Sequence, residues 1–117
     1  MKSYHKLVVW KEAHTLTLMV YKTTQQFPKE ELYGLTSQIR RAVISVAANI
    51  VEGQARVFKK EFLQFLSISH GSLVEVEYYL ELAKDVKYIN DREYQALERQ
   101  RAKTGFLLHS FTKSLRV

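Results

Sequence analysis

The sequence predicts an all-α protein, an antiparallel up-down-up-down four-helix bundle. Apolar residues recur at steps of three and four through most of the chain, the period of an amphipathic helix. Only one proline and four glycines occur among 117 residues, too few for the many turns of a strand-rich fold. The connections between the periodic segments are short, which makes consecutive helices antiparallel neighbours. The length corresponds to one domain, residues 1–117.

A first helix is predicted over residues 7–25. Its apolar face is marked by Trp10, Ala13, Thr17, Val20 and Thr24. The helix must end before Pro28, because a proline disfavours helical geometry in the residue before it. Glu30 and Glu31 then suit the positive end of the dipole of a following helix.

The second helix is predicted over residues 31–52, and Gly53 is expected to close it in a left-handed cap. Its wide apolar stripe indicates contact with more than one neighbour. The residues of that stripe are Leu32, Leu35, Ile39, Ala42, Val46 and Asn49.

A third helix is predicted over residues 59–86, with Gly71 in its interior. A glycine inside a helix costs up to about 1 kcal/mol, so we expect another helix to approach closely there. The same period runs through Phe62, Phe65, Leu66, Ser69, Leu73, Val76, Leu80 and Ala83.

The fourth helix is predicted over residues 91–115. Asn90 and Glu93 have the spacing of a capping box at its start. Arg101 lies on the apolar seam, where a guanidinium needs an acidic partner or a position at the edge.

Charge is distributed unevenly along the chain, whose formal net charge is +6 and whose sequence pI is about 9.6. Residues 1–60 contain ten Lys/Arg and four Asp/Glu, residues 61–98 contain three and eight, and residues 99–117 contain five and none. An acidic middle between basic ends permits electrostatic self-complementarity, and it leaves basic surface for an anionic partner.

Several kinds of chemistry have no support in the sequence. Without cysteine, the chain has no disulfide, no thiol nucleophile and no cysteine-based zinc site. No histidine follows an acidic residue at the Glu-x-x-His spacing of di-iron bundles, and no phosphate-binding glycine loop is present. We therefore predict no enzyme, no catalytic residue, no metal and no cofactor. No apolar run approaches the roughly 20 residues of a membrane span, so a soluble, cytoplasmic protein without membrane contact is expected.

Polar residues form a stripe beside the apolar stripe of the second helix. We expect this stripe to be a structural network that sets the register between helices, together with Glu75 of the third helix. A surface that contacts a ligand or RNA is the alternative. The residues on the second helix are Gln38, Arg41, Ser45, Asn49 and Glu52, and Arg40 lies next to them.

Motifs in order along the chain resemble one family, the four-helix bundle proteins encoded within intervening sequences of bacterial large-subunit ribosomal RNA genes. The most recognisable segment is Asn49-Ile50-Val51-Glu52-Gly53. The other matching segments are Leu7 to Ala13, Phe27-Pro28, Tyr33-Gly34-Leu35, Gln38 to Ala42, Glu61 to Leu66 and Gly71 to Glu75. One departure is Phe58, which stands where the family usually has the Ser or Thr that caps the third helix with Glu61.

The resemblance implies an antiparallel four-helix bundle that assembles as a ring-shaped homopentamer with no established enzymatic activity. It also implies similarity to the accessory variability determinant of diversity-generating retroelements, a ring that binds nucleic acid and a reverse transcriptase. A ring would multiply the modest basic charge of one subunit and add avidity.

We therefore expect a non-enzymatic ring that binds RNA or DNA through backbone phosphates, with counterion release and little base reading. The expected contacts are Arg56, Lys59 and Lys60 between the second and third helices, and Lys103, Lys113 and Arg116 on the last helix. Arg40 and Arg41 could contribute, although structural pairing is expected for at least one of them. The alternatives are a scaffold that recruits a protein partner and a small-molecule site among Asn49, Glu52 and Glu75.

Overall fold

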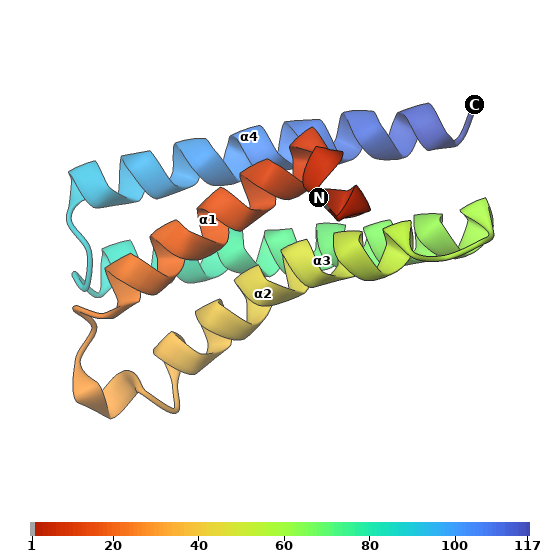
Figure 1. Ribbon diagram of the computed structural model, residues 1–117. Coiled ribbons are helices and arrows are strands. Elements are labelled where there is room, and N and C mark those ends of the chain that lie inside the picture. The colour runs from red at the N-terminus through yellow and green to blue at the C-terminus, as the bar shows by residue number, and fades with distance from the viewer. Residues whose placement is uncertain (1) are drawn as a thin grey trace.

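The computed structural model describes residues 2–117 and confirms the all-α four-helix bundle (Figure 1). Along the chain the elements are η1 (Ser3–Lys6), α1 (Val8–Thr24), η2 (Lys29–Glu31), α2 (Leu35–Gln54), α3 (Lys59–Asp85) and α4 (Asp91–Leu115), where η marks a short 3-10 helix. The bundle measures 43 × 26 × 24 Å, so its long axis follows the helices.

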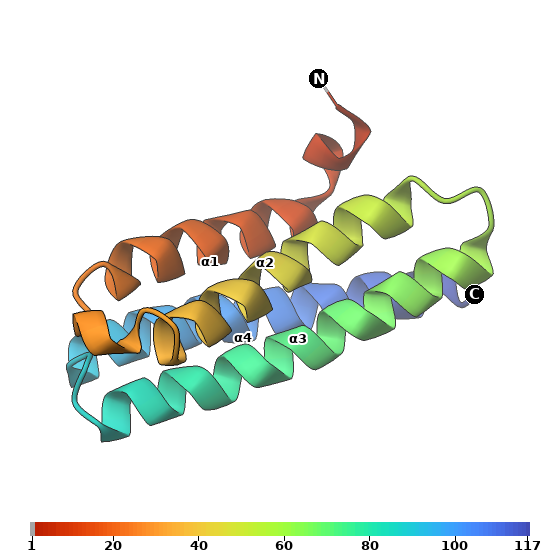
Figure 2. The same ribbon diagram turned by 90° about the horizontal axis from the view of Figure 1, so that it is seen from below.

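Contacts between helices establish the antiparallel order. On α2 and α3, the Ser69 hydroxyl donates to the carbonyl of Val46 at 2.7 Å, whereas Gly53, further along α2, lies against Phe62, nearer the start of α3. Residue numbers therefore rise along one helix as they fall along the other. Figure 2 shows the consequence: the α1–α2 and α3–α4 connections lie at one end, and the α2–α3 loop and the C-terminus lie at the other.

The apolar stripes of the four helices meet in one core. Every helix contributes large side chains with almost no exposure, each of which stabilises the fold by about 1.5–3 kcal/mol when it is buried. The largest are Leu16 of α1, Ile39 and Ile50 of α2, Leu66 and Leu80 of α3, and Leu97 and Leu108 of α4.

The start of α4 has the predicted capping box. The Glu93 amide donates to Asn90 Oδ1 at 2.8 Å, and the Asn90 amide donates to Glu93 Oε1 at 2.9 Å. At the start of α3, Phe58 occupies the capping position. It supplies no side-chain hydrogen bond, because a phenyl ring has no oxygen to accept a backbone amide.

The predicted start of the second helix at residue 31 is wrong, because α2 begins at Leu35. Lys29–Glu31 forms the separate turn η2, and Glu31 Oε1 accepts the Leu35 amide at 3.0 Å from outside the helix. The Tyr88 hydroxyl donates to the other Glu31 oxygen at 2.7 Å. Both hydrogen bonds lower the pKa of Glu31, and the bond from the Leu35 amide has the larger effect.

Both expectations about glycines are wrong. Gly53 lies inside α2, which continues to Gln54, and its φ is not positive. A Cβ atom at this position would come within 2.8 Å of Phe62 Cδ1 and 2.9 Å of Phe65 Cβ, so Gly53 makes room for aromatic side chains of α3. Gly71 is the opposite case, because a Cβ atom there would meet nothing within 4 Å.

Candidate nucleic-acid interface

The fold gathers three separate segments in one half of the molecule, seen on the right in Figure 2. The Ser3 hydroxyl donates to Gln54 Oε1 at 3.0 Å, which ties the N-terminal segment to the end of α2. Lys59 Nζ lies 3.4 Å from the carbonyl oxygen of Val117, which links the start of α3 to the end of the chain. Segments more than 50 positions apart in sequence thus share one surface.

These three segments, residues 2–11, 52–61 and 109–117, are called the basic end. They contain eight Lys/Arg and two Asp/Glu, which equals the whole formal net charge of +6, since the other residues contain ten of each. All eight cations are exposed. They are Lys2, Lys6, Lys11, Arg56, Lys59, Lys60, Lys113 and Arg116.

Most of these cations are free of acidic partners within residues 2–117. Arg56 is the exception: its guanidinium lies 3.2 Å from Glu52 Oε1 and 4.7 Å from the centre of the Phe65 ring. Both members of the Arg56–Glu52 pair are substantially exposed, so their attraction is weak and screened by salt. The basic end therefore presents a positive surface that is not neutralised from within.

Five of the six predicted contact residues lie in the basic end, and Lys103 does not. Lys103 Nζ lies 3.4 Å from Glu12 Oε1 on the side of the bundle where α1 meets α4. Glu12 also accepts Gln100 Nε2 at 2.9 Å, and this bond, followed by Lys103, lowers the Glu12 pKa against the opposing effect of burial. We therefore assign Lys103 to the contact between helices.

The contact residues predicted from the sequence do not include three cations of the basic end: Lys2, Lys6 and Lys11. They lie far from Arg56 along the chain, and no local run of charge marks them. The predicted antiparallel topology could have identified them, because in an antiparallel bundle the start of α1 must lie beside the end of α2.

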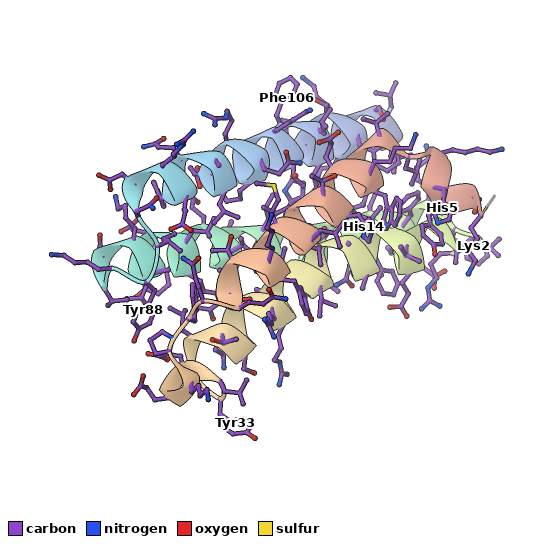
Figure 3. The ribbon with its side chains drawn as sticks, turned by 60° about the vertical axis from the view of Figure 1, so that its left-hand side comes forward. Lys2, His5, His14, Tyr33, Tyr88 and Phe106 are labelled. Atoms are coloured by element: carbon purple, nitrogen blue, oxygen red, sulfur yellow. The ribbon has the colours of Figure 1, made fainter. Side chains whose placement is uncertain are left out.

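An aromatic cluster of four rings lies between these lysines, and we call it the N-terminal aromatic cluster. Trp10 and His14, one turn apart on α1, stack with centroids 4.9 Å apart and planes at 10°. Tyr4 and His5 of η1 lie 5.0 and 5.1 Å from the Trp10 ring. Figure 3 labels Lys2, His5 and His14 along this part of the molecule, far from Tyr33 and Tyr88 at the opposite end.

The predicted polar network on α2 is only partly formed. Asn49 Nδ2 donates to the Ser45 carbonyl and hydroxyl oxygens at 2.8 and 2.9 Å, and the Ser72 hydroxyl of α3 donates to the Ser45 hydroxyl at 2.7 Å. Glu52 pairs with Arg56 instead. This cluster joins α2 to α3.

The remaining predicted members of the network, Gln38, Arg41 and Glu75, are exposed. Within residues 2–117 their side chains make no hydrogen bond or ion pair, because they lie on the outer side of the helices. Arg40, in contrast, is structural: its Nε donates to Thr24 Oγ1 at 2.8 Å, and its guanidinium lies 4.7 Å from the centre of the Tyr21 ring.

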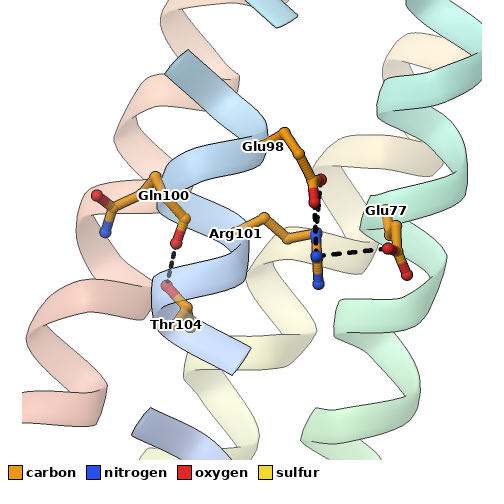
Figure 4. Close-up of polar contacts among 5 residues, drawn as sticks. All are labelled: Glu77, Glu98, Gln100, Arg101 and Thr104. Atoms are coloured by element: carbon orange, nitrogen blue, oxygen red, sulfur yellow. Dashed lines mark hydrogen bonds and ion pairs between the residues drawn. The ribbon is translucent and has the colours of Figure 1, made fainter. Parts of the chain in front are cut away.

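Arg101 has the acidic partners that its position on the seam requires (Figure 4). Its Nε and a terminal nitrogen donate to the two carboxylate oxygens of Glu98 at 2.7 and 2.6 Å. Glu77 of α3 lies 3.4 Å away. The hydrogen bonds to Glu98 are the main cause of a raised Arg101 pKa, and the charge of Glu77 adds to the effect. Burial of the guanidinium acts in the opposite direction. The Thr104 hydroxyl donates to the Gln100 carbonyl on the same helix.

His70 faces the C-terminal part of α4, where its Nε2 lies 3.4 Å from the Thr112 hydroxyl. Burial lowers the His70 pKa, and electrostatic interaction with the nearby His109 and Arg116 lowers it further. Within residues 2–117 no group of three or more His, Cys, Asp or Glu side chains is placed to bind a metal ion. No helix in the described part of the chain is long and apolar enough to span a membrane.

Residues 5–110 match the family described as the 23S rRNA-intervening sequence protein. The chain belongs to this family. Among solved structures, it is similar to a protein of unknown function from the S23 ribosomal protein family of Bacteroides thetaiotaomicron VPI-5482, determined at 1.70 Å resolution. The two chains are 26% identical with a TM-score of 0.81, and the similarity covers 91% of this chain and 99% of the other. None of the curated proteins matches the chain.

Membership of the 23S rRNA-intervening sequence family confirms the resemblance that the sequence motifs indicated. The most recognisable family segment, Asn49–Gly53, lies at the end of α2. Asn49 donates to the Ser45 hydroxyl, which also accepts the Ser72 hydroxyl of α3, and Gly53 makes room for Phe62. The match includes the α2–α3 loop and most of the N-terminal aromatic cluster. Lys2, Lys113 and Arg116 lie outside it.

Proposed function

We propose that this protein binds RNA or DNA through backbone phosphates with its basic end. The observation that carries the proposal is the concentration of the whole formal net charge of +6 in three adjoining segments with all eight cations exposed. Lysine and arginine side chains that approach phosphates release condensed counterions, which drives binding of any sequence. Contacts of this kind position a protein on nucleic acid with little base reading.

The proposed role is binding without a chemical step. Eight of the ten Lys, Arg, Asp and Glu side chains gathered on this surface are lysines and arginines, which neutralise phosphates. The carboxylates of Glu12 and Glu98 are engaged in contacts within and between helices. These arrangements support a non-enzymatic protein.

We also propose that the chain forms a ring-shaped homopentamer through the outer faces of α2 and α3. Large apolar side chains remain exposed there, including Ile44, Ile68 and Tyr78. Arg41 on α2 and Glu75 on α3 are exposed and carry opposite charges. Neither forms an ion pair within residues 2–117, so each can pair with a neighbouring copy. Five basic ends in one ring would bind with avidity.

A salt series of fluorescence anisotropy titrations with a ribosomal RNA fragment and a DNA duplex tests the proposed binding. We expect micromolar or tighter binding that weakens linearly on a log–log plot as salt rises, because several phosphates are neutralised. Replacing Arg56, Lys59 and Lys60 with Glu should abolish binding without unfolding the bundle, as followed by circular dichroism.

The matched control reverses three exposed cations at the opposite end, Lys22, Lys29 and Arg92, with the same change in net charge. It should reduce affinity far less than the first triple variant. Equal losses of affinity in both variants would show that affinity depends only on the total charge. The basic end would then have no specific role in binding. Absence of binding at low salt would overturn nucleic-acid binding and favour a scaffold that recruits a protein partner through its exposed apolar face.

A further inference from the structure

The N-terminal aromatic cluster places four aromatic rings on a basic surface, and phosphate binding alone does not explain the presence of these rings. Its four rings touch one another and lie among three exposed lysines, Lys2, Lys6 and Lys11. His14 is exposed, whereas Tyr4, His5 and Trp10 are partly covered. The surface therefore combines flat aromatic rings with positive charge.

We propose that this cluster stacks with unpaired bases, so that the partner of the basic end is single-stranded nucleic acid. This inference rests on the proposed function, because it names the form of nucleic acid that the same surface takes. Non-specific single-strand binding combines a basic surface that follows the backbone with aromatic rings on which bases stack. The two parts occur together here on η1 and the first turns of α1.

The rings are held in place before any ligand arrives. Trp10 packs against the apolar core, His14 stacks on it at 10°, and Tyr4 meets its edge at 73°. The hydrogen bond from Ser3 to Gln54 anchors η1 to α2. Rings that are already ordered lose little conformational freedom on binding, which favours affinity.

The charges fit a strand whose bases face the rings. Lys11 and His14 lie one turn apart on α1, and Lys6 is the last residue of η1, two positions before α1 begins. Phosphates on either side of a stacked base can therefore meet lysine side chains. A duplex presents phosphates to the same lysines but keeps its bases paired and stacked on each other, so it can use only the charge.

Trp10 makes the inference directly measurable, because it is the only tryptophan in the chain. The experiment follows tryptophan fluorescence and anisotropy together, using a labelled single-stranded RNA of about 12 nucleotides, within the usual range of site sizes, and a duplex of the same sequence. We expect both ligands to raise the anisotropy signal. Only the single strand should quench Trp10, and it should bind more tightly than the duplex.

Variants of the exposed ring separate stacking from charge. His14→Ala should weaken single-strand binding about tenfold, in line with the loss of one stacked base, and should leave duplex binding unchanged. His14→Phe should restore single-strand binding, since it keeps a flat ring without the imidazole. Thr15→Ala, the neighbouring exposed residue, is the control and should change neither affinity.

The outcomes distinguish this inference from the proposed function. Binding of both ligands with no quenching of Trp10 and no effect of His14→Ala would overturn base stacking and leave phosphate binding intact. Equal quenching by duplex and single strand would also overturn it. If neither ligand binds at low salt, both the proposed function and this inference fail.

Discussion

At the scale of single residues, Arg101 shows how a charged side chain is tolerated on a helix seam. Its side chain is 15% exposed, and two hydrogen bonds to Glu98 satisfy the carboxylate and the guanidinium together. Glu77 adds a contact from α3. Removing one partner leaves the other partly buried and uncompensated, which costs more than the pair contributes.

Arg101→Ala should therefore destabilise the protein by about 2 kcal/mol, the usual size for charge-assisted hydrogen bonds. Arg99→Ala, an exposed arginine two positions earlier on α4, is the control and should change the free energy of unfolding by less than about 0.5 kcal/mol. Urea denaturation followed by circular dichroism measures both. Equal effects of the two variants would contradict a specific role for Arg101.

At the scale of elements, the helix starts differ in how their backbone amides are satisfied. The start of α4 has a complete capping box, and α2 receives a hydrogen bond from Glu31 outside the helix. At the start of α3, Phe58 is 69% exposed and supplies no cap. The beginning of α3 is therefore a helix start that a single substitution can improve.

Phe58→Ser should stabilise the protein by about 0.5–1 kcal/mol, because the serine hydroxyl can accept an amide at the start of α3 and Glu61 can complete a capping box. Phe58→Ala removes the same ring without adding a cap and is the control. Thermal unfolding of the two variants gives the comparison. A serine variant no more stable than the alanine variant would show that the loop before α3 cannot adopt the capping geometry.

At the scale of the whole molecule, the antiparallel topology separates charge. The α2–α3 loop, the N-terminal segment and the C-terminus share one half, and the remaining residues have no net charge. The outer faces of α2 and α3, which we propose for ring contacts, extend along the length of the bundle, whereas the cations of the basic end lie in one half. One subunit can thus use different surfaces for assembly and for nucleic acid.

Light scattering on the purified protein should give a mass five times that of the 13.7-kDa chain. Ile68→Asp, at a 52% exposed position on α3, should reduce the mass to that of one chain without loss of helix content. Tyr33→Asp, at a 92% exposed position beyond those faces, should leave the ring intact. A wild-type protein with the mass of a single chain would overturn the proposed ring.

The sequence by itself determined the helical class, the four helices, the α4 capping box and the need of Arg101 for acidic partners. These features depend on local periodicity and on side chains a few positions apart, which the sequence displays directly. Only the tertiary structure decided that Gly53 accommodates Phe62, that the Tyr88 hydroxyl donates to Glu31, and that Lys103 pairs with Glu12. It also decided that Lys2, Lys6 and Lys11 join Arg56 and Arg116 at one end. Such contacts join residues far apart in the chain, and they exist only once antiparallel packing has placed the helix ends side by side.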